Sequence, residues 1–145
     1  MAYLYDEEKY YYYANLYFKG SIWDEKTKEL LYKVNNYCNH EFNSVLLNMY
    51  KDGKDTIQWH SDKEKELGNF AIIASINLGA SRKFWFLNKE TGEKDFVICK
   101  NGDLLIMNVG FQENFLHAML PEKEIKDSRI SLTFRKVNYD ITNIS

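Results

Sequence analysis

The sequence predicts a mostly β protein in which about eight short strands form a double-stranded β-helix, or jelly roll, with one helix packed on it. Two observations predict this class. Between Phe42 and Val137, short runs of strand-forming residues are separated by residues typical of turns, such as those around Gly53, Gly79 and Gly102. A single stretch with helical spacing of its apolar residues precedes them. Short strands at this spacing are typical of sandwiches and jelly rolls.

The first twenty residues are rich in tyrosine and show no clear period, although the tyrosines of Tyr10–Tyr13 could line one side of an extended segment. A helix is predicted to follow, with Asp24 as its N-cap. Its apolar stripe consists of Leu30, Leu31, Val34 and Cys38. We treat residues 1–145 as one domain, with residues 1–41 as the segment and helix that precede a core of residues 42–137.

Eight strands are predicted in that core, and turn residues separate them. The predicted strands are Asn43–Tyr50, Thr56–His60, Phe70–Leu78, Arg82–Leu87, Asp95–Cys99, Leu104–Asn108, Asn114–Met119 and Arg129–Val137.

Net charge, cysteine content and the length of apolar runs limit the classes of protein to which this chain can belong. The formal net charge is −2 and the pI is about 5.9, so no global basic field indicates a nucleic-acid partner, although a local basic rim would suffice. Cys38 and Cys99 have no metal-like spacing, which suits reduced thiols inside a cell. No apolar run resembles a membrane span or a signal peptide. We expect a soluble, intracellular monomer in the cytoplasm or nucleus.

The tripeptide His60-Ser-Asp62 indicates a metal site. Residues two apart in an extended chain project to the same face, so both side chains can reach one ion. His117, on another predicted strand, is the candidate third ligand, whereas His40 is expected at the surface or in packing. Two histidines and one carboxylate leave the open positions that oxygen-activating iron(II) requires. The alternative is a hydrogen-bonded pair at a strand end, because this short pattern is common by chance.

The last predicted strand makes the metal interpretation stronger. Its polar face consists of Arg129, Ser131, Thr133 and Arg135. Two of the three arginines of the chain therefore share one face, and an arginine binds carboxylates in a bidentate way that lysine cannot match. Asn48 and Tyr50 share a face of the first core strand and could also bind an organic acid. A solvated strand face, with Tyr50 in simple packing, is the alternative.

At this point the chain resembles the AlkB family of iron- and 2-oxoglutarate-dependent dioxygenases, and most closely its branch that repairs alkylated nucleic acids. The resemblance covers about residues 42–137. It is carried by Phe42–Gly53, Ile57–Asp62 with Glu64, Ile73–Arg82, Gly102–Met107, His117 and Arg129–Lys136.

The resemblance implies a role for each matching position. His60, Asp62 and His117 match the iron(II) ligands. The residues that match contacts to the cosubstrate 2-oxoglutarate are Asn48, Tyr50, Arg129, Thr133 and Arg135. Arg129 matches the partner of the distal carboxylate, and Arg135 lies nearer the iron. O2 is the second cosubstrate.

Three further positions match or suggest substrate contacts. Glu64 falls where the family has an acidic residue beside the target base, and Arg82 matches a residue near the substrate. The tyrosine cluster occupies the place of a lid, and Tyr13 is the candidate for stacking on the base. Family members that open duplex DNA carry a longer lid and a hairpin, which we expect to be missing here. The expected substrate is therefore single-stranded.

Three functions are consistent with the sequence. The favoured one is oxidative demethylation of alkylated bases of the 1-methyladenine and 3-methylcytosine type in DNA or RNA. The second is the same chemistry on a protein side chain or a small molecule. The third is a non-catalytic jelly roll in which His60 and Asp62 are structural.

Overall fold

The computed structural model describes residues 2–5, 10–13, 16–19, 21–62 and 71–137, and for residues 2–22 it describes the backbone alone. All eight predicted core strands are present, with ends that differ by up to three residues from the prediction. They are β5 (Ser44–Tyr50), β6 (Ile57–His60), β7 (Ile73–Gly79), β8 (Arg82–Asn88), β9 (Lys94–Cys99), β10 (Leu104–Met107), β11 (Phe115–Met119) and β12 (Arg129–Arg135).

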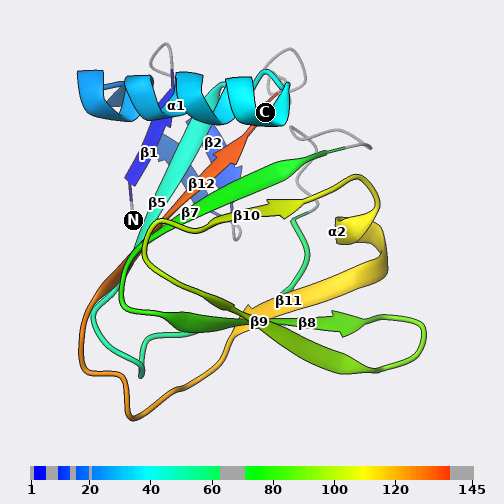
Figure 1. Ribbon diagram of the computed structural model, residues 1–145. Helices are drawn as coiled ribbons and strands as arrows, with labels where there is room; N and C mark the ends of the chain where they lie inside the picture. Colours follow the sequence, from blue (N-terminus) through cyan, green and yellow to red (C-terminus); the bar gives the residue numbers. More distant parts are fainter. Residues whose placement is uncertain (1, 6–9, 14–15, 20, 63–70, 138–145) are drawn as a thin grey trace.

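Two sheets stack face to face, as the ribbon in Figure 1 shows. One has six strands in the order β10-β7-β12-β5-β1-β4, and the other has four in the order β6-β11-β8-β9. Buried side chains fill part of the space between the sheets, among them Leu46, Ile73, Phe84 and Met107. The predicted jelly roll is confirmed.

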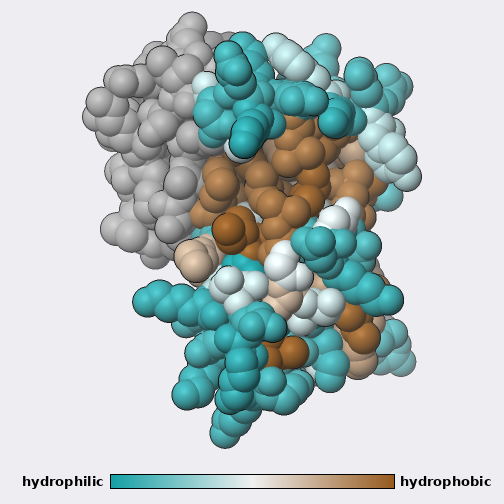
Figure 2. Space-filling view, turned by 60° about the vertical axis from the view of Figure 1, so that its left-hand side comes forward, coloured by the Kyte–Doolittle hydropathy of each residue, from teal (hydrophilic) through white to brown (hydrophobic). Residues whose placement is uncertain are grey.

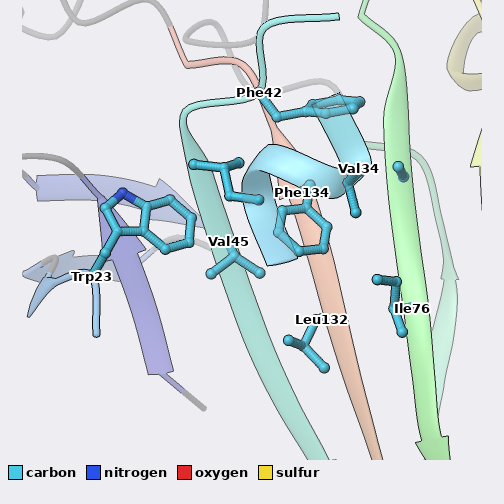
Figure 3. Packing of buried hydrophobic residues seen from close by; sticks show 9 residues of the cluster. Trp23, Val34, Phe42, Val45, Ile76, Leu132 and Phe134 are labelled. Carbon is cyan, nitrogen blue, oxygen red and sulfur yellow. The ribbon is translucent and has the colours of Figure 1, made fainter. Parts of the chain in front are cut away.

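The predicted helix is α1 (Glu25–Cys38), and the Asp24 carboxylate caps it by accepting a 2.9 Å hydrogen bond from the Thr27 N–H. It lies on the face of the six-stranded sheet that is turned away from the four-stranded sheet (Figure 1). Figure 3 shows Val34 of the helix together with Phe42, Val45 and Phe134 in this second core. Burying this stripe stabilises the helix far more than its intrinsic propensity does.

The segment before the helix differs from the prediction. β1 (Ala2–Tyr5) pairs antiparallel with β5, and the two-residue strand β4 (Ser21–Ile22) pairs parallel with β1. The six-stranded sheet therefore extends into the part of the chain that was predicted to precede the core. These two strands are short and show no alternation of their own, so the sequence did not indicate them.

A hairpin is also present where none was expected. β2 (Tyr10–Tyr13) and β3 (Leu16–Lys19) pair antiparallel as a separate two-stranded sheet. The expectation that the segment lacks a hairpin is wrong, because two runs of β-forming tyrosine, leucine and phenylalanine are separated by only two residues.

The helix covers only part of the outer face of the six-stranded sheet. Cross-strand register places Met49, Ile130 and Leu78 in one row, in which Met49 is 60% exposed and Leu78 is 41% exposed. Figure 2 shows a continuous apolar area on one face of the molecule. Within the described ranges, no helix has the length and apolar character needed to cross a bilayer.

Candidate active site

Three candidate metal ligands meet at one end of the four-stranded sheet. His60 ends β6, Asp62 follows it by two residues, and His117 lies opposite His60 on β11. One ligand atom from each residue lies within 4.8 Å of the other two. Cross-strand pairing brings the two histidines together, and the extended chain after β6 brings Asp62 to the same side.

The orientation of His60 is set by its own strand. Its Nδ1 lies 2.7 Å from the carbonyl oxygen of Gln58, and a carbonyl only accepts, so Nδ1 carries a proton and donates it. Nε2 then faces Oδ1 of Asp62 at 3.4 Å. Burial acts to lower the pKa of His60, but the contact with the Asp62 carboxylate outweighs it and raises the pKa. A cation between the two groups would take the place of a shared proton.

Asp62 is held as a carboxylate. Its Oδ2 accepts a 3.0 Å hydrogen bond from Nη2 of Arg135, and its backbone N–H donates to Oε1 of Gln112 at 2.8 Å. Burial alone would raise the pKa of Asp62, but the Arg135 guanidinium and the contact with His60 keep it well below its usual range. Oδ1 has no hydrogen-bond partner in the described part of the chain. The carboxylate therefore presents one open oxygen beside the two imidazoles.

His117 is buried between aromatic rings. Its ring stacks on Phe84 with centroids 5.3 Å apart and lies 4.2 Å from the ring of His60. Burial lowers the pKa of His117 to about 4, so the imidazole is neutral near pH 7. Two imidazole nitrogens and one ionised oxygen on one side of a cavity match the donor set of non-haem iron(II) sites. The residues present fit that ion.

The cavity beside these ligands lies between the two sheets. Its described lining consists of Asn48, Tyr50, Ile57, His60, Asp62, Ser75, Phe84, Leu105, Met107, His117, Ala118, Met119, Arg129, Ser131, Thr133 and Arg135. Strands β6 and β11 and the residues just after β6 supply the candidate metal ligands. Strands β5 and β12 of the other sheet supply the polar groups on the opposite side of the cavity. The structure thus brings together all the residues that were predicted for iron and for 2-oxoglutarate.

Arg129 is the cavity residue that best fits an anionic ligand. It is only 3% exposed, and its guanidinium lies over the ring of Tyr50, 5.0 Å from the ring centroid. Nη2 donates to Oδ1 of Asn77, while Nε and Nη1 have no hydrogen-bond partner among the residues that the structure describes. Burial lowers the pKa of Arg129, but a guanidinium stays protonated in proteins. Its unpartnered donors can bind a carboxylate.

Arg82 is placed differently from the prediction. It is 1% exposed, its Nε donates to Oε2 of Glu122 at 2.8 Å, and its other nitrogens donate to the carbonyls of Asp52, Asp55 and Leu120. These contacts leave the guanidinium anchoring two loops, so the predicted substrate contact is corrected. No local pattern could indicate this, because the partners lie 27 to 40 residues away.

The other two predicted substrate contacts fall outside the described part of the chain. Glu64 lies outside the described residues, and the side chain of Tyr13 does as well, although its backbone belongs to β2. Sequence reasoning missed Gln112 of α2 (Phe111–Asn114), which binds the Asp62 backbone, and Asn77 of β7, which binds Arg129. No motif marks either amide.

Comparison with known proteins gives a consistent result. The family model described as the 2OG-Fe(II) oxygenase superfamily matches residues 2–135. The human alpha-ketoglutarate-dependent dioxygenase alkB homolog 3 is 35% identical over 127 residues, which cover 81% of this chain and 44% of that protein. The human DNA oxidative demethylase ALKBH2 is 36% identical over 112 residues, which cover 72% and 43%. The resemblance to the AlkB family is confirmed.

This chain spans less than half the length of those two relatives. The solved structure of OsALKBH1 aligns with a TM-score of 0.63 at 16% identity, covering 81% of this chain and 66% of that one. At that identity the alignment supports the jelly-roll fold.

Proposed function

Because this chain belongs to the 2OG-Fe(II) oxygenase superfamily, we propose that it is an iron(II)- and 2-oxoglutarate-dependent dioxygenase that oxidatively demethylates alkylated bases in DNA or RNA. One observation carries the proposal. The open oxygen of Asp62 and the unpartnered donors of Arg129 face the same cavity from its two sheets. Such a cavity suits a metal at one end and a dicarboxylate that reaches the other.

The residues of the chain have separate tasks in this reaction. His60, Asp62 and His117 would hold the iron, and Arg129 would orient the distal carboxylate of 2-oxoglutarate. Bound iron(II) would couple two oxidations by O2, that of 2-oxoglutarate to succinate and carbon dioxide and that of an N-methyl group to a hydroxymethyl group, which then leaves as formaldehyde. Arg135 keeps Asp62 ionised, and Phe84 keeps His117 in place, so both ligands are set before the metal binds.

The nucleic-acid substrate is supported by the named activity of ALKBH2, a DNA oxidative demethylase, at 36% identity. A base that reaches a cavity between two sheets must leave its stack, and this costs least in a single strand. We therefore propose that single strands are preferred, with the protein acting as a monomer. Tyr13 and Glu64 stay predicted contacts to the base.

Mass spectrometry of methylated oligonucleotides tests the proposal. Wild-type protein with iron(II), ascorbate and 2-oxoglutarate should remove the methyl groups of 1-methyladenine and 3-methylcytosine, faster from single strands than from duplexes. A His60→Ala variant serves as the inactive control. Succinate release without any demethylated product would point to another substrate and overturn the nucleic-acid assignment.

A further inference from the structure

Asn77 contacts Arg129 but does not belong to the described lining of the cavity. It lies on β7, opposite Ser131 of β12, and is 1% exposed. Its Oδ1 accepts the hydrogen bond from Nη2 of Arg129. Because a guanidinium only donates, the amide must present its oxygen to Arg129. The amide therefore restrains the Nη2 end of the guanidinium and leaves Nε and Nη1 without a hydrogen-bond partner among the described residues.

The charge of Arg129 is left without a counter-ion. In the described ranges no carboxylate forms an ion pair with it. The Tyr50 ring under Arg129 also lies under a second guanidinium, that of Arg82, which is 5.7 Å from the ring centroid. Burial raises the pKa of Tyr50, so the phenol is neutral near pH 7. An isolated buried cation is unfavourable, and an anion that enters the cavity relieves that cost.

We propose that Asn77 is a positioning residue that orients Arg129 while leaving its charge uncompensated, so that the site selects oxoacids with a second carboxylate. This inference rests on the proposed function. A carboxylate at position 77 would orient Arg129 equally well but would also neutralise it. The amide gives the orientation without the neutralisation.

An Asn77→Asp substitution separates these two effects, since it keeps the acceptor and adds the charge. The measurement is isothermal titration calorimetry of zinc-loaded protein with 2-oxoglutarate and with 2-oxopentanoate. The second ligand has a methyl group in place of the distal carboxylate. The dissociation constant of 2-oxopentanoate divided by that of 2-oxoglutarate measures how much the distal carboxylate contributes to binding.

We expect Asn77→Asp to reduce this ratio by about tenfold or more, because the added carboxylate neutralises Arg129 and weakens its charged contact with the distal carboxylate. The melting temperature should be no lower than that of wild type, since the hydrogen bond to Arg129 is kept. In turnover, the KM for 2-oxoglutarate should rise while kcat changes little. Asn101→Asp is the matched control, because Asn101 is exposed and its Oδ1 caps the Gly79 N–H. That variant should leave the ratio unchanged.

The outcomes are distinct. An unchanged ratio in Asn77→Asp would overturn the role of Asn77 and leave the proposed function intact. Wild-type protein that binds neither oxoacid would overturn the proposed function, and the inference with it. If Asn77→Asp does not fold, Asn77→Ser removes the hold on Arg129 without adding charge. Its ratio should also fall, and an unchanged ratio there would overturn the proposal.

Discussion

Each of the three metal-ligand side chains is prepared for a cation by a different neighbour. The carbonyl oxygen of Gln58 accepts a hydrogen bond from Nδ1–H of His60, Arg135 keeps Asp62 ionised, and burial keeps His117 neutral. These contacts orient the ligands in the absence of the ion, which lowers the cost of binding it.

Removing one ligand should abolish metal-dependent turnover. His117→Ala leaves two protein ligands, so iron content and succinate release should both fall to background. Circular dichroism should still show a folded domain. His40→Ala is the control, since that ring packs on Phe42 with centroids 4.5 Å apart, and it should retain activity. Normal succinate release by His117→Ala would rule out the metal assignment.

The geometry of Arg129 also matters, beyond its charge. Arg129→Lys keeps the positive charge but loses the planar donor set and the stacking on Tyr50. We expect the KM for 2-oxoglutarate to rise about tenfold or more, which is the loss of one charged hydrogen bond. Steady-state kinetics at varied 2-oxoglutarate measure it, and an unchanged KM would mean that Arg129 binds something else.

Residue type alone could not separate Arg82 from Arg129 and Arg135. All three arginines are buried, and the alternation of β12 correctly put two of them on the cavity face. Arg82 has the same chemistry, but its partners are three backbone carbonyls and Glu122 in loops remote in sequence. Such contacts depend on the finished fold, and no local pattern predicts them.

Two loops, the one after β5 and the one before β12, are joined by backbone hydrogen bonds. The loop after β5 and the loop before β12 exchange hydrogen bonds between the backbones of Gly53 and Glu122 and between Gly53 and Ile125. A Cβ at Gly53 would lie 1.7 Å from the carbonyl oxygen of Glu122. The glycine is therefore required by close backbone approach.

Gly53→Ala should lower the free energy of unfolding by about 1–3 kcal/mol, because the two backbones must separate. Chemical denaturation measures it. Gly92→Ala is a useful comparison, since a Cβ there would have nothing within 4 Å and the φ of +74° adds only conformational strain. A Gly53→Ala variant as stable as wild type would show that close backbone approach does not require the glycine.

Arg82 anchors the same loops, so its loss should act on stability. Arg82→Met leaves Glu122 buried without its partner, which costs about 3–5 kcal/mol. The melting temperature should fall sharply, whereas Glu122→Gln should cost less because the amide can still accept. If Arg82→Met instead weakened oligonucleotide binding at unchanged stability, the original substrate role would be restored.

The helix α1 and the eight core strands were predictable from the sequence, because amphipathic spacing and turn residues mark each of them. β1 and β4 were not, since they gain stability from pairing with β5 and with each other rather than from a pattern of their own. The four-residue helix α2 was missed for a similar reason, being too short to show helical spacing.

In the molecule as a whole, each of the two sheets contributes different residues to the lining of the cavity. β6, β11 and the residues after β6 carry the candidate metal ligands, and β5 and β12 carry the residues proposed to bind the oxoacid. Neither sheet alone contains a complete site. The packing between the sheets, through Leu46, Ile73 and Phe84, thus sets the distance between metal and carboxylate partner.

The position of β12 in the six-stranded sheet also determines when that sheet can be completed during translation. It is the last described strand to leave the ribosome, yet it lies between β5 and β7 and carries Arg129, Thr133 and Arg135. β5 must wait for a partner made about 80 residues later, or roughly 4–16 s at ordinary elongation rates. During that interval the unpaired N–H and C=O groups along its edge can pair with other chains. Slow translation should therefore lower the yield of active protein through aggregation on the nascent chain.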